Sequence, residues 1–230
     1  MKAVLIWALL GLGCAVLVAC GGAQKTTKKA QDAVDTAPPV SGPERHILAL
    51  GDSLFAGYGV KREESYPARL EAALRAKGVN VRVHNAGVSG DTSADGLARL
   101  VFTLSSQAQK PDLVIISLGG NDMLRALPPE ETRANMAAIL AELRRRNMRV
   151  VLMGMLAAPN LGKDYVTKFK AIYPDLAKQY GAGLVPFFLS AVVEKPELQQ
   201  ADHIHPTAQG IEAMVAVTMD DVLGAILNLE

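Results

Sequence analysis

The chain has few cysteines, histidines and tryptophans and no marked excess of basic residues. Its 230 residues include two cysteines, four histidines and one tryptophan. Two cysteines cannot build a zinc cluster or a framework of disulfides. Basic and acidic residues nearly balance, with 24 Lys and Arg against 23 Asp and Glu, so no basic excess is present to bind nucleic acid. We therefore expect an ordinary globular protein without a nucleic-acid partner.

The first 19 residues have the composition of a secretory signal. Lys2 is followed by an uncharged apolar run over residues 3–19, which is slightly short for a membrane-spanning helix. The run leads into LVACG, which resembles the lipobox of bacterial lipoproteins, where the signal is cut before the cysteine and that cysteine carries lipid. The resemblance implies that Cys20 is lipidated; an uncleaved N-terminal anchor is the alternative. Both interpretations tether the chain to a membrane outside the cytoplasm.

Removal of residues 1–19 would change the composition of the remaining chain. It removes Cys14, the tryptophan and Lys2, which leaves 23 basic and 23 acidic residues. With Cys20 lipidated, no thiol remains for a nucleophile, a metal site or a disulfide. Residues 20–44 are expected to be the lipidated cysteine and a flexible linker, because they are rich in Gly, Pro, Thr and Lys without apolar periodicity. In bacterial lipoproteins the residue after the lipidated cysteine is associated with the membrane of residence. The resemblance therefore implies, from the glycine after Cys20, anchoring in the outer membrane of a bacterial cell envelope, facing the periplasm.

The remaining residues, 45–230, alternate short apolar runs with helical patterns. The runs typical of buried strands, most of them followed by glycine, cover residues 46–50, 79–86, 113–118, 149–153 and 183–186. The helical patterns cover residues 66–77, 93–107, 129–146, 163–180 and 207–229. In the second helical pattern one apolar stripe is formed by Leu97, Leu100, Val101 and Leu104. Strict alternation predicts one α/β domain with a mainly parallel five-stranded sheet between helices.

Polar clusters follow four of the predicted strands, at the edge where ligands bind to such a sheet. The clusters are GDSL at 51–54, NAGVSGDT at 85–92, GGND at 119–122 and ADHIHP at 201–206. Each of these sequences, taken alone, is common in ordinary turns. Four clusters at one edge of the sheet are hard to explain as turns, so they indicate a functional site.

The clusters contain the groups that acyl transfer requires, which are a nucleophile, a base, a carboxylate that orients the base, and donors to the oxyanion. Ser53 is the candidate nucleophile, although a helix-capping role would also explain a serine there. Asn121 offers a side-chain N–H to an oxyanion. Gly90 allows a backbone N–H to approach the same oxygen, and the N–H of Ser53 would be a third donor.

The small number of histidines limits the choice of base. His46 and His84 lie within predicted strands, so the base is His203 or His205. His205 is favoured because Asp202, three residues earlier, can reach its Nδ1 side in a turn. His203 is adjacent to Asp202 and would point elsewhere if the backbone is extended.

These four clusters together resemble the conserved blocks of the SGNH hydrolases, also called GDSL esterases and lipases. Longer stretches such as NAGVSGDTSADGLARL and LGGNDMLRALPPEET are similar to the bacterial acyl-CoA thioesterase I, protease I and lysophospholipase L1 group. The similarity spans about residues 46–228. It implies a flavodoxin-like three-layer α/β/α fold, a Ser53, Asp202 and His205 triad, and an oxyanion hole of Ser53, Gly90 and Asn121. It implies no metal and no other cofactor.

The resemblance also implies a reaction and a substrate class. The reaction is hydrolysis of carboxylic esters with short to medium acyl chains, such as aryl esters and lysophospholipids, through an acyl-Ser53 intermediate. Thioesters are a second candidate class of substrate. Apolar loops after the third and fourth strands are expected to hold the acyl chain, with Leu124, Met155 and Pro159 as candidates. A lipoprotein leader makes cytosolic acyl-CoA an unexpected substrate. The catalytic domain is expected to be monomeric.

Three further positions bear on the resemblance. Asp52 and Asp122 would be supporting turn residues. His203 stands where relatives are expected to have a small residue, which leaves the triad untouched.

One alternative is a metal-dependent phosphoesterase. Side chains of the type that bind paired metals are present at Asp52, Asp91, Asn121, His203 and His205. This interpretation needs a metal-binding histidine in the first cluster, and that cluster has none.

The other alternative is a non-enzymatic, flavodoxin-like lipoprotein that binds a small ligand. Gly57, Gly59 and Thr92 could cradle a phosphate. However, the chain has no glycine-rich phosphate loop, and the triad would have no purpose. A serine esterase is therefore the favoured interpretation.

Overall fold

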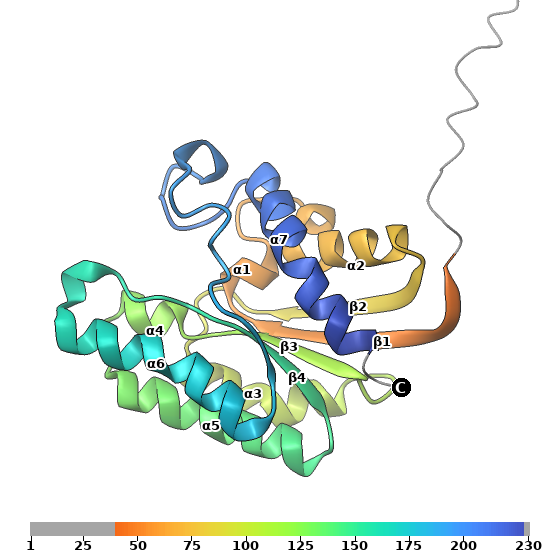
Figure 1. Ribbon diagram of the computed structural model, residues 1–230, viewed down its shortest axis with the longest axis horizontal. Helices are drawn as coiled ribbons and strands as arrows, with labels where there is room; N and C mark the ends of the chain where they lie inside the picture. Colours follow the sequence, from red (N-terminus) through yellow and green to blue (C-terminus); the bar gives the residue numbers. More distant parts are fainter. Residues whose placement is uncertain (1–39, 228–230) are drawn as a thin grey trace, which may run out of the picture. The chain divides into compact units, whose positions relative to one another are not determined.

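A computed structural model describes residues 40–227 as a sheet covered by helices on both faces (Figure 1). The strands are β1 (Ser41–Gly51), β2 (Val79–Gly87), β3 (Leu113–Ser117), β4 (Arg149–Met153) and β5 (Gly183–Val185). The α-helices are α1 (Ser53–Ala56), α2 (Tyr66–Ala76), α3 (Ser93–Ser105), α4 (Gly120–Leu124), α5 (Pro129–Arg145), α6 (Lys163–Tyr180) and α7 (Ala208–Leu227). Short 3-10 helices are η1 (Arg62–Glu64), η2 (Pro159–Leu161) and η3 (Pro196–Leu198).

The five strands are all parallel and follow the order β2-β1-β3-β4-β5. This is the flavodoxin-like order, in which the direction of winding reverses beside β1. Gly51, the last residue of β1, pairs with Gly87 on one side and with Ser117 on the other. The carboxyl ends of these three strands therefore lie at one level, and ligand binding is expected just beyond them.

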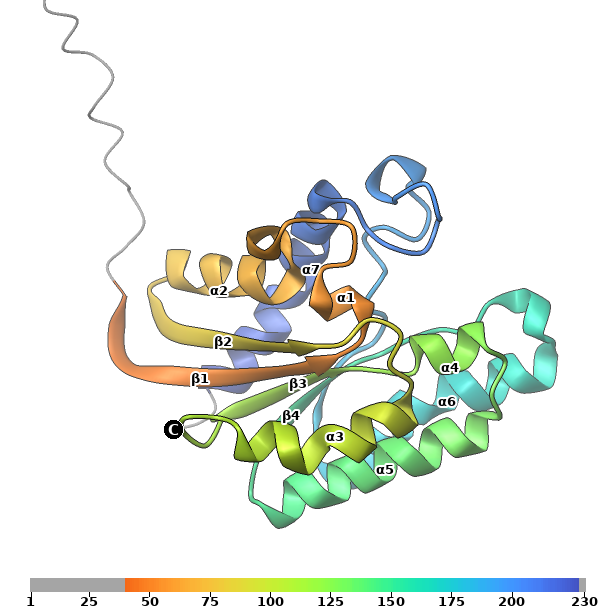
Figure 2. The ribbon, with the colours of Figure 1, turned by 180° about the vertical axis from the view of Figure 1, so that it is seen from behind.

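Helices form a layer on each side of the sheet. Helices α2 and α7 cover one face, whereas α3, α5 and α6 cover the other (Figures 1 and 2). The central strand β3 is buried along its whole length, as expected for a parallel strand covered on both faces. The predicted three-layer α/β/α architecture is confirmed.

The predicted strands and long helices are all present, and their ends agree to within a few residues except at β1. This strand begins at Ser41, so residues 41–44 belong to the sheet and not to the predicted linker. The Ser41 N–H donates to the Gly78 carbonyl oxygen at 3.1 Å, and the Asn80 side chain donates to the Gly42 carbonyl oxygen, also at 3.1 Å. Pairing with the start of β2 orders a segment whose composition alone is that of a linker.

Two predictions about burial are wrong. Val81 is the only fully buried residue of β2, because this strand lies at an edge of the sheet. In α3, Leu100 and Leu104 face the core, but Val101 is 52% exposed. The buried face of α3 is centred instead on Gly96, where a Cβ atom would come within 2.3 Å of the Leu118 side chain.

The predicted signal, Cys20 and most of the predicted linker lie outside the described residues. Over residues 40–227, no helix combines the length and the hydropathy that a membrane span requires.

Candidate active site

Ser53 lies where β1 ends and α1 begins. Asp52 caps this short helix, because its carboxylate accepts a hydrogen bond from the Leu54 N–H at 3.0 Å. The side chains of Leu54 and Phe55 are buried and anchor the turn. At Gly51 a Cβ atom would come within 2.6 Å of the Phe55 ring, so the turn has no room for a side chain there. The packing thus leaves Ser53 partly exposed at the carboxyl edge of the sheet.

His205 connects Ser53 to Asp202 through its two ring nitrogens. Its Nε2 lies 2.8 Å from Ser53 Oγ, although the two residues are 152 positions apart in the sequence. Its Nδ1 lies 2.6 Å from Asp202 Oδ2. The other oxygen of Asp202 accepts the backbone N–H groups of Ile204 and His205, both at 3.0 Å. Ser53, His205 and Asp202 thus have the mutual geometry of a nucleophile, a base and an orienting carboxylate.

Hydrogen bonds hold Asp202 in its ionised form. The backbone N–H of His205 is the largest influence, followed by the His205 side chain and the N–H of Ile204, and together they lower the pKa of Asp202 to about 2. A charged Asp202 favours the tautomer of His205 with its proton on Nδ1. Nε2 is then free to accept a proton from Ser53.

His203 lies away from this hydrogen-bonded chain. Its backbone has a left-handed φ of 57°, so the extended backbone on which the prediction for His203 was conditional is not found. Its N–H donates to the Gln200 carbonyl oxygen at 3.0 Å, and its side chain is exposed. A left-handed φ favours glycine or asparagine, so the small residue that the resemblance implies here would fit this backbone with less strain than histidine.

The predicted oxyanion donors come from three different strand connections. Ser53 is the first residue of α1, so its N–H has no acceptor within the helix. Gly90 has a φ of 89°, a conformation that glycine adopts without strain. The Asn121 side chain donates one N–H to the Asp91 carbonyl oxygen at 2.9 Å, which orients the amide and leaves its second N–H for another acceptor.

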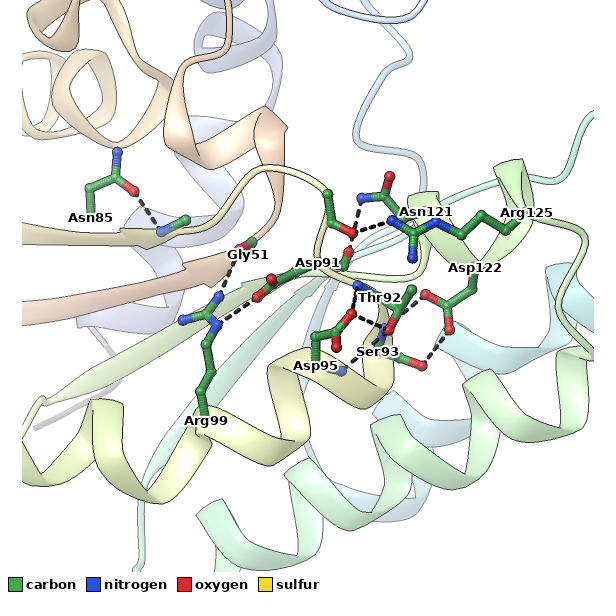
Figure 3. Close-up of polar contacts among 12 residues, drawn as sticks. Gly51, Asn85, Asp91, Thr92, Ser93, Asp95, Arg99, Asn121, Asp122 and Arg125 are labelled. Atoms are coloured by element: carbon green, nitrogen blue, oxygen red, sulfur yellow. Dashed lines mark hydrogen bonds and ion pairs between the residues drawn. The ribbon is translucent and has the colours of Figure 1, made fainter.

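Arg99, a residue that the motifs did not single out, holds two of these connections together (Figure 3). Its Nε donates to the Asp91 carboxylate at 2.6 Å, and its Nη2 donates to the Gly51 carbonyl oxygen at 2.9 Å. Arg125 also donates to the Gly90 carbonyl oxygen, at 2.7 Å. The loop after β2 is therefore fixed relative to the end of β1, just before Ser53.

Asp122 supports the site as expected, although it lies in α4 and not in a turn. It is buried and accepts hydrogen bonds from the backbone N–H and the hydroxyl of Ser93 (Figure 3). It also accepts a hydrogen bond from the hydroxyl of Thr132. These contacts link α4 to the start of α3 and to α5. These hydrogen bonds also hold the neighbouring Asn121 in position, because it lies in the same helix.

Asp52, the other expected supporting residue, is a buried acid directly before the nucleophile. Burial raises its pKa to about 7; the N–H of Leu54 lowers the pKa, whereas the charges of Asp91 and Asp122 raise it further. Asp52 is thus a cap whose charge changes near neutral pH.

The three residues expected to hold the acyl chain lie in different surroundings. Leu124 in α4 is 52% exposed, and Pro159 in η2 is exposed. Met155 is buried, with its Cε atom 3.2 Å from the position that a Cβ on Gly120 would occupy. Met155 therefore lies beside the start of α4, the helix that carries Asn121, whereas the other two face solvent.

Tyr58 and Gln200 contact the His205 region and were missed in the sequence. The Tyr58 ring centroid lies 4.4 Å from that of the His205 imidazole. Gln200 donates from its backbone N–H to the His205 carbonyl oxygen at 2.7 Å. The only signal in the sequence is the run Gly57-Tyr58-Gly59 shortly after Ser53, which does not by itself point to His205.

The side chains required by a metal-dependent mechanism are used elsewhere. Asp91 pairs with Arg99, and His205 bridges Ser53 and Asp202. Within residues 40–227 no three His, Cys, Asp or Glu side chains are grouped so that they could hold a metal ion. The residues named for a phosphoesterase therefore do not assemble into a paired-metal site in this part of the chain.

Comparison with known families and proteins points to one class of enzyme. Residues 49–213 match the GDSL-like lipase/acylhydrolase family. An arylesterase of Vibrio mimicus is 43% identical over 160 residues, which are 70% of this chain and 79% of that protein. The thioesterase 1/protease 1/lysophospholipase L1 of Escherichia coli strain K12 is 41% identical over 182 residues, which are 79% of this chain and 85% of that enzyme.

A solved structure is similar over the same region. The crystal structure of AlinE4, an SGNH-hydrolase family esterase, is 57% identical in sequence and has a TM-score of 0.69. The similarity covers 81% of this chain and 98% of AlinE4.

Proposed function

Because the chain belongs to the GDSL-like lipase/acylhydrolase family and is a serine esterase of the SGNH type, we propose that Ser53, His205 and Asp202 are its catalytic triad. The observation that carries this proposal is the position of His205, with Nε2 at 2.8 Å from Ser53 Oγ and Nδ1 at 2.6 Å from Asp202 Oδ2. All three side chains belong to the same chain, so the triad needs no residue from a second subunit.

The first step is acylation of Ser53. Its Oγ attacks the ester carbonyl carbon while its proton moves to Nε2 of His205. When the tetrahedral intermediate collapses, the bond between that carbon and the leaving oxygen breaks, and His205 gives its proton to the leaving alcohol. Asp202, ionised throughout because its pKa is about 2, stabilises the transient imidazolium.

The second step is hydrolysis of the acyl-Ser53 ester. Water forms a new bond to the acyl carbon and gives a proton to His205. The bond to Ser53 Oγ then breaks, and Oγ regains the proton. A carboxylic acid leaves, and the site returns to its starting state without a cofactor.

Negative charge on the carbonyl oxygen in both steps requires hydrogen-bond donors. We assign this oxyanion hole to the N–H groups of Ser53 and Gly90 and to the Asn121 side chain. Arg99 and Asp91 support this assignment, because they fix the loop of Gly90 against the end of β1. Donors that are held in place before the reaction need little rearrangement as charge develops.

The substrates are expected to be small esters. The names of the two relatives, an arylesterase and a thioesterase 1/protease 1/lysophospholipase L1, point to aryl esters, thioesters and lysophospholipids. For this chain we propose short to medium acyl chains, held by the loops of Leu124, Met155 and Pro159.

The central test is an ester panel assayed with the full chain in detergent. The panel contains a short aryl ester, a medium-chain aryl ester, a lysophospholipid and an acyl thioester. Ser53→Ala is expected to abolish hydrolysis of every ester in the panel, while its melting temperature stays within a few degrees of that of the parent. Ser106→Ala, a change at the far end of α3, is the matched control and should retain full activity. A Ser53→Ala protein as active as its parent would refute the triad.

The location of the enzyme is a separate part of the proposal. We place it on the outer membrane of the cell envelope, facing the periplasm, through lipid on Cys20 after removal of residues 1–19. The sequence LVACG and the preceding apolar run support this anchor. Lipidated lipoproteins carry more than one acyl chain, which is needed because a single chain gives only marginal binding to a bilayer.

Labelling with a clickable fatty acid tests the anchor. Expressed in a bacterial host, the parent should take up label and fractionate with membranes. Cys20→Ala should lose the label, whereas Cys14→Ala should keep it. Equal labelling of all three proteins would show that Cys20 is not the lipid attachment site.

A further inference from the structure

Tyr58 packs against the proposed catalytic base while much of its ring remains open to solvent. Its ring centroid lies 4.4 Å from the His205 imidazole, with 33° between the two planes. The residue is 53% exposed, whereas the His205 side chain is only 16% exposed. An aromatic side chain usually gains stability through burial, so an exposed ring beside the base invites a functional explanation.

The backbone directs Tyr58 to this position. The N–H groups of Gly57 and Tyr58 both donate to the Ser53 carbonyl oxygen, at 3.1 and 3.2 Å, which ties the turn to the nucleophile. Gly57 and Gly59, on either side, have φ values of 83° and 72°. A Cβ atom on Gly59 would come within 2.1 Å of Gln200 Oε1, so a side chain there would displace the contact. The turn is therefore built around two glycines that present the tyrosine.

Gln200 locks the Tyr58 turn to the loop of His205. Its side-chain Nε2 donates to the carbonyl oxygens of Tyr58 and Pro206, at 2.8 and 2.9 Å. Its backbone N–H donates to the His205 carbonyl oxygen at 2.7 Å. One residue thus ties the backbone of Tyr58 to the backbone of the His205 loop.

The role of His205 as the base determines which part of a bound substrate lies near Tyr58. His205 must deliver its proton from Nε2 to the leaving oxygen, so that oxygen comes within hydrogen-bond distance of Nε2. The alcohol part of the ester is then beside the imidazole, and the ring at 4.4 Å borders the same space. The acyl part, attached to the carbon that Ser53 attacks, extends in another direction.

We propose that Tyr58 forms the leaving-group subsite of this esterase and that its exposed ring selects flat aromatic alcohols. Aromatic rings attract one another in offset or edge-to-face arrangements at centroid separations of about 4.5–7 Å, beyond the effect of burial alone. An aryl group on the leaving oxygen can pack on the ring in this way, whereas an aliphatic alcohol of similar size gains only burial. The proposal rests on the proposed triad.

The test compares two acetates with leaving groups of similar acidity, phenyl acetate and hexafluoroisopropyl acetate. The full chain is assayed as the parent, Tyr58→Leu and Tyr58→Phe. For Tyr58→Leu, kcat/KM on phenyl acetate should fall about threefold to tenfold, with less than a twofold change on the aliphatic ester. Tyr58→Phe should behave as the parent on both, because the ring and not the hydroxyl makes the contact.

Inhibition by the product alcohol gives a second readout that does not depend on turnover of the ester being compared. Phenol should inhibit the parent more strongly than Tyr58→Leu, and cyclohexanol should inhibit the two proteins equally. An equal loss of kcat/KM on both acetates would mean that Tyr58 only positions His205, and no loss on either would mean that the ring does not contact the leaving group. Both outcomes overturn the subsite while leaving the triad intact, since the triad is tested by Ser53→Ala.

Discussion

The guanidinium of Arg99 lies 2.6 Å from the carboxylate of Asp91, at the carboxyl edge of the sheet. The same guanidinium donates to the Gly51 carbonyl oxygen at 2.9 Å, and the backbone carbonyl of Asp91 orients Asn121. This pair is partly shielded, with side-chain exposures of 21% for Arg99 and 12% for Asp91. Charge-assisted hydrogen bonds in such surroundings are stronger than those of exposed ion pairs.

Arg99→Leu should therefore impair catalysis without removing a group that touches the substrate. Loosening the Gly90 loop and the Asn121 amide is expected to lower kcat about 10- to 100-fold, below the cost of deleting an oxyanion donor, with little change in KM. The unpaired Asp91 should also cost about 1–3 kcal/mol of unfolding free energy. Steady-state kinetics and urea denaturation measure the two effects. Arg133→Leu, which breaks the exposed pair with Asp175, is the matched control and should change neither; a normal kcat for Arg99→Leu would contradict the positioning role.

Asn121→Ala should slow turnover much more than it weakens binding. Loss of one oxyanion donor typically lowers kcat by about 10² to 10³. The measurement is kcat and KM on an aryl ester at saturating concentration. Asn80→Ala removes a partly buried amide at the start of β2, which bonds to Gly42 far from the site, and it should behave as the parent. If Asn121→Ala keeps most of the parent activity, Asn121 is not an oxyanion donor.

Asp52 should make stability depend on pH in an unusual direction. Its pKa is about 7 in the folded protein, above the ordinary value of 3.8, so the folded state binds the proton more tightly than the unfolded chain does. This contribution to stability is full below about pH 3.8 and is lost as the pH rises from there through 7, by at most about 1.4 kcal/mol per pH unit. Asp52→Asn keeps a capping side chain but cannot ionise.

The measurement is urea unfolding of the parent and Asp52→Asn at several values between pH 5 and pH 8. The variant should gain stability relative to the parent as the pH rises. Asp175→Asn, a change of an exposed carboxylate, serves as the control for general charge effects. A difference between Asp52→Asn and the parent that stays constant with pH would show that Asp52 has the same pKa in both states.

Leu124→Ala and Met155→Ala should change the preference for acyl-chain length. Met155 is buried beside the start of α4, the helix of Asn121, so its truncation should shift the optimum toward longer chains and also reduce stability by about 2–5 kcal/mol. Leu124 is half exposed, so its truncation should lower kcat/KM on long-chain esters with little effect on stability. A series of aryl esters from two to twelve carbons, about the range of short to medium chains, measures the preference. Val217→Ala on α7 is the control, and an unaltered series for both variants would exclude these loops from the acyl pocket.

Much of the fold follows from local sequence patterns. Apolar runs that end in glycine and alternate with helical patterns require parallel strands, because each helix returns the chain to the same end of the sheet. The carboxyl ends of the strands therefore share one edge, which is why the polar clusters could be placed together. The pairing of Asp202 with His205 was also predictable, because a separation of three residues is closed within one turn.

The linker boundary and the burial of β2 could not be predicted in this way. Whether Ser41 joins a strand depends on its partner Gly78, and whether β2 is covered depends on its place at the sheet edge. Both are set by strand order, which local composition does not encode.

The sequence by itself determined the α/β class, the candidate nucleophile, base and carboxylate, and the family resemblance, since these depend on residue identity and short spacings. Only the tertiary structure decided which residues support them. Arg99 reaches Gly51, and Tyr58 reaches His205, because strands and loops distant in sequence meet at one edge. The raised pKa of Asp52 likewise depends on burial. Such contacts come from the packing of residues that are distant in the sequence, so local sequence patterns cannot predict them.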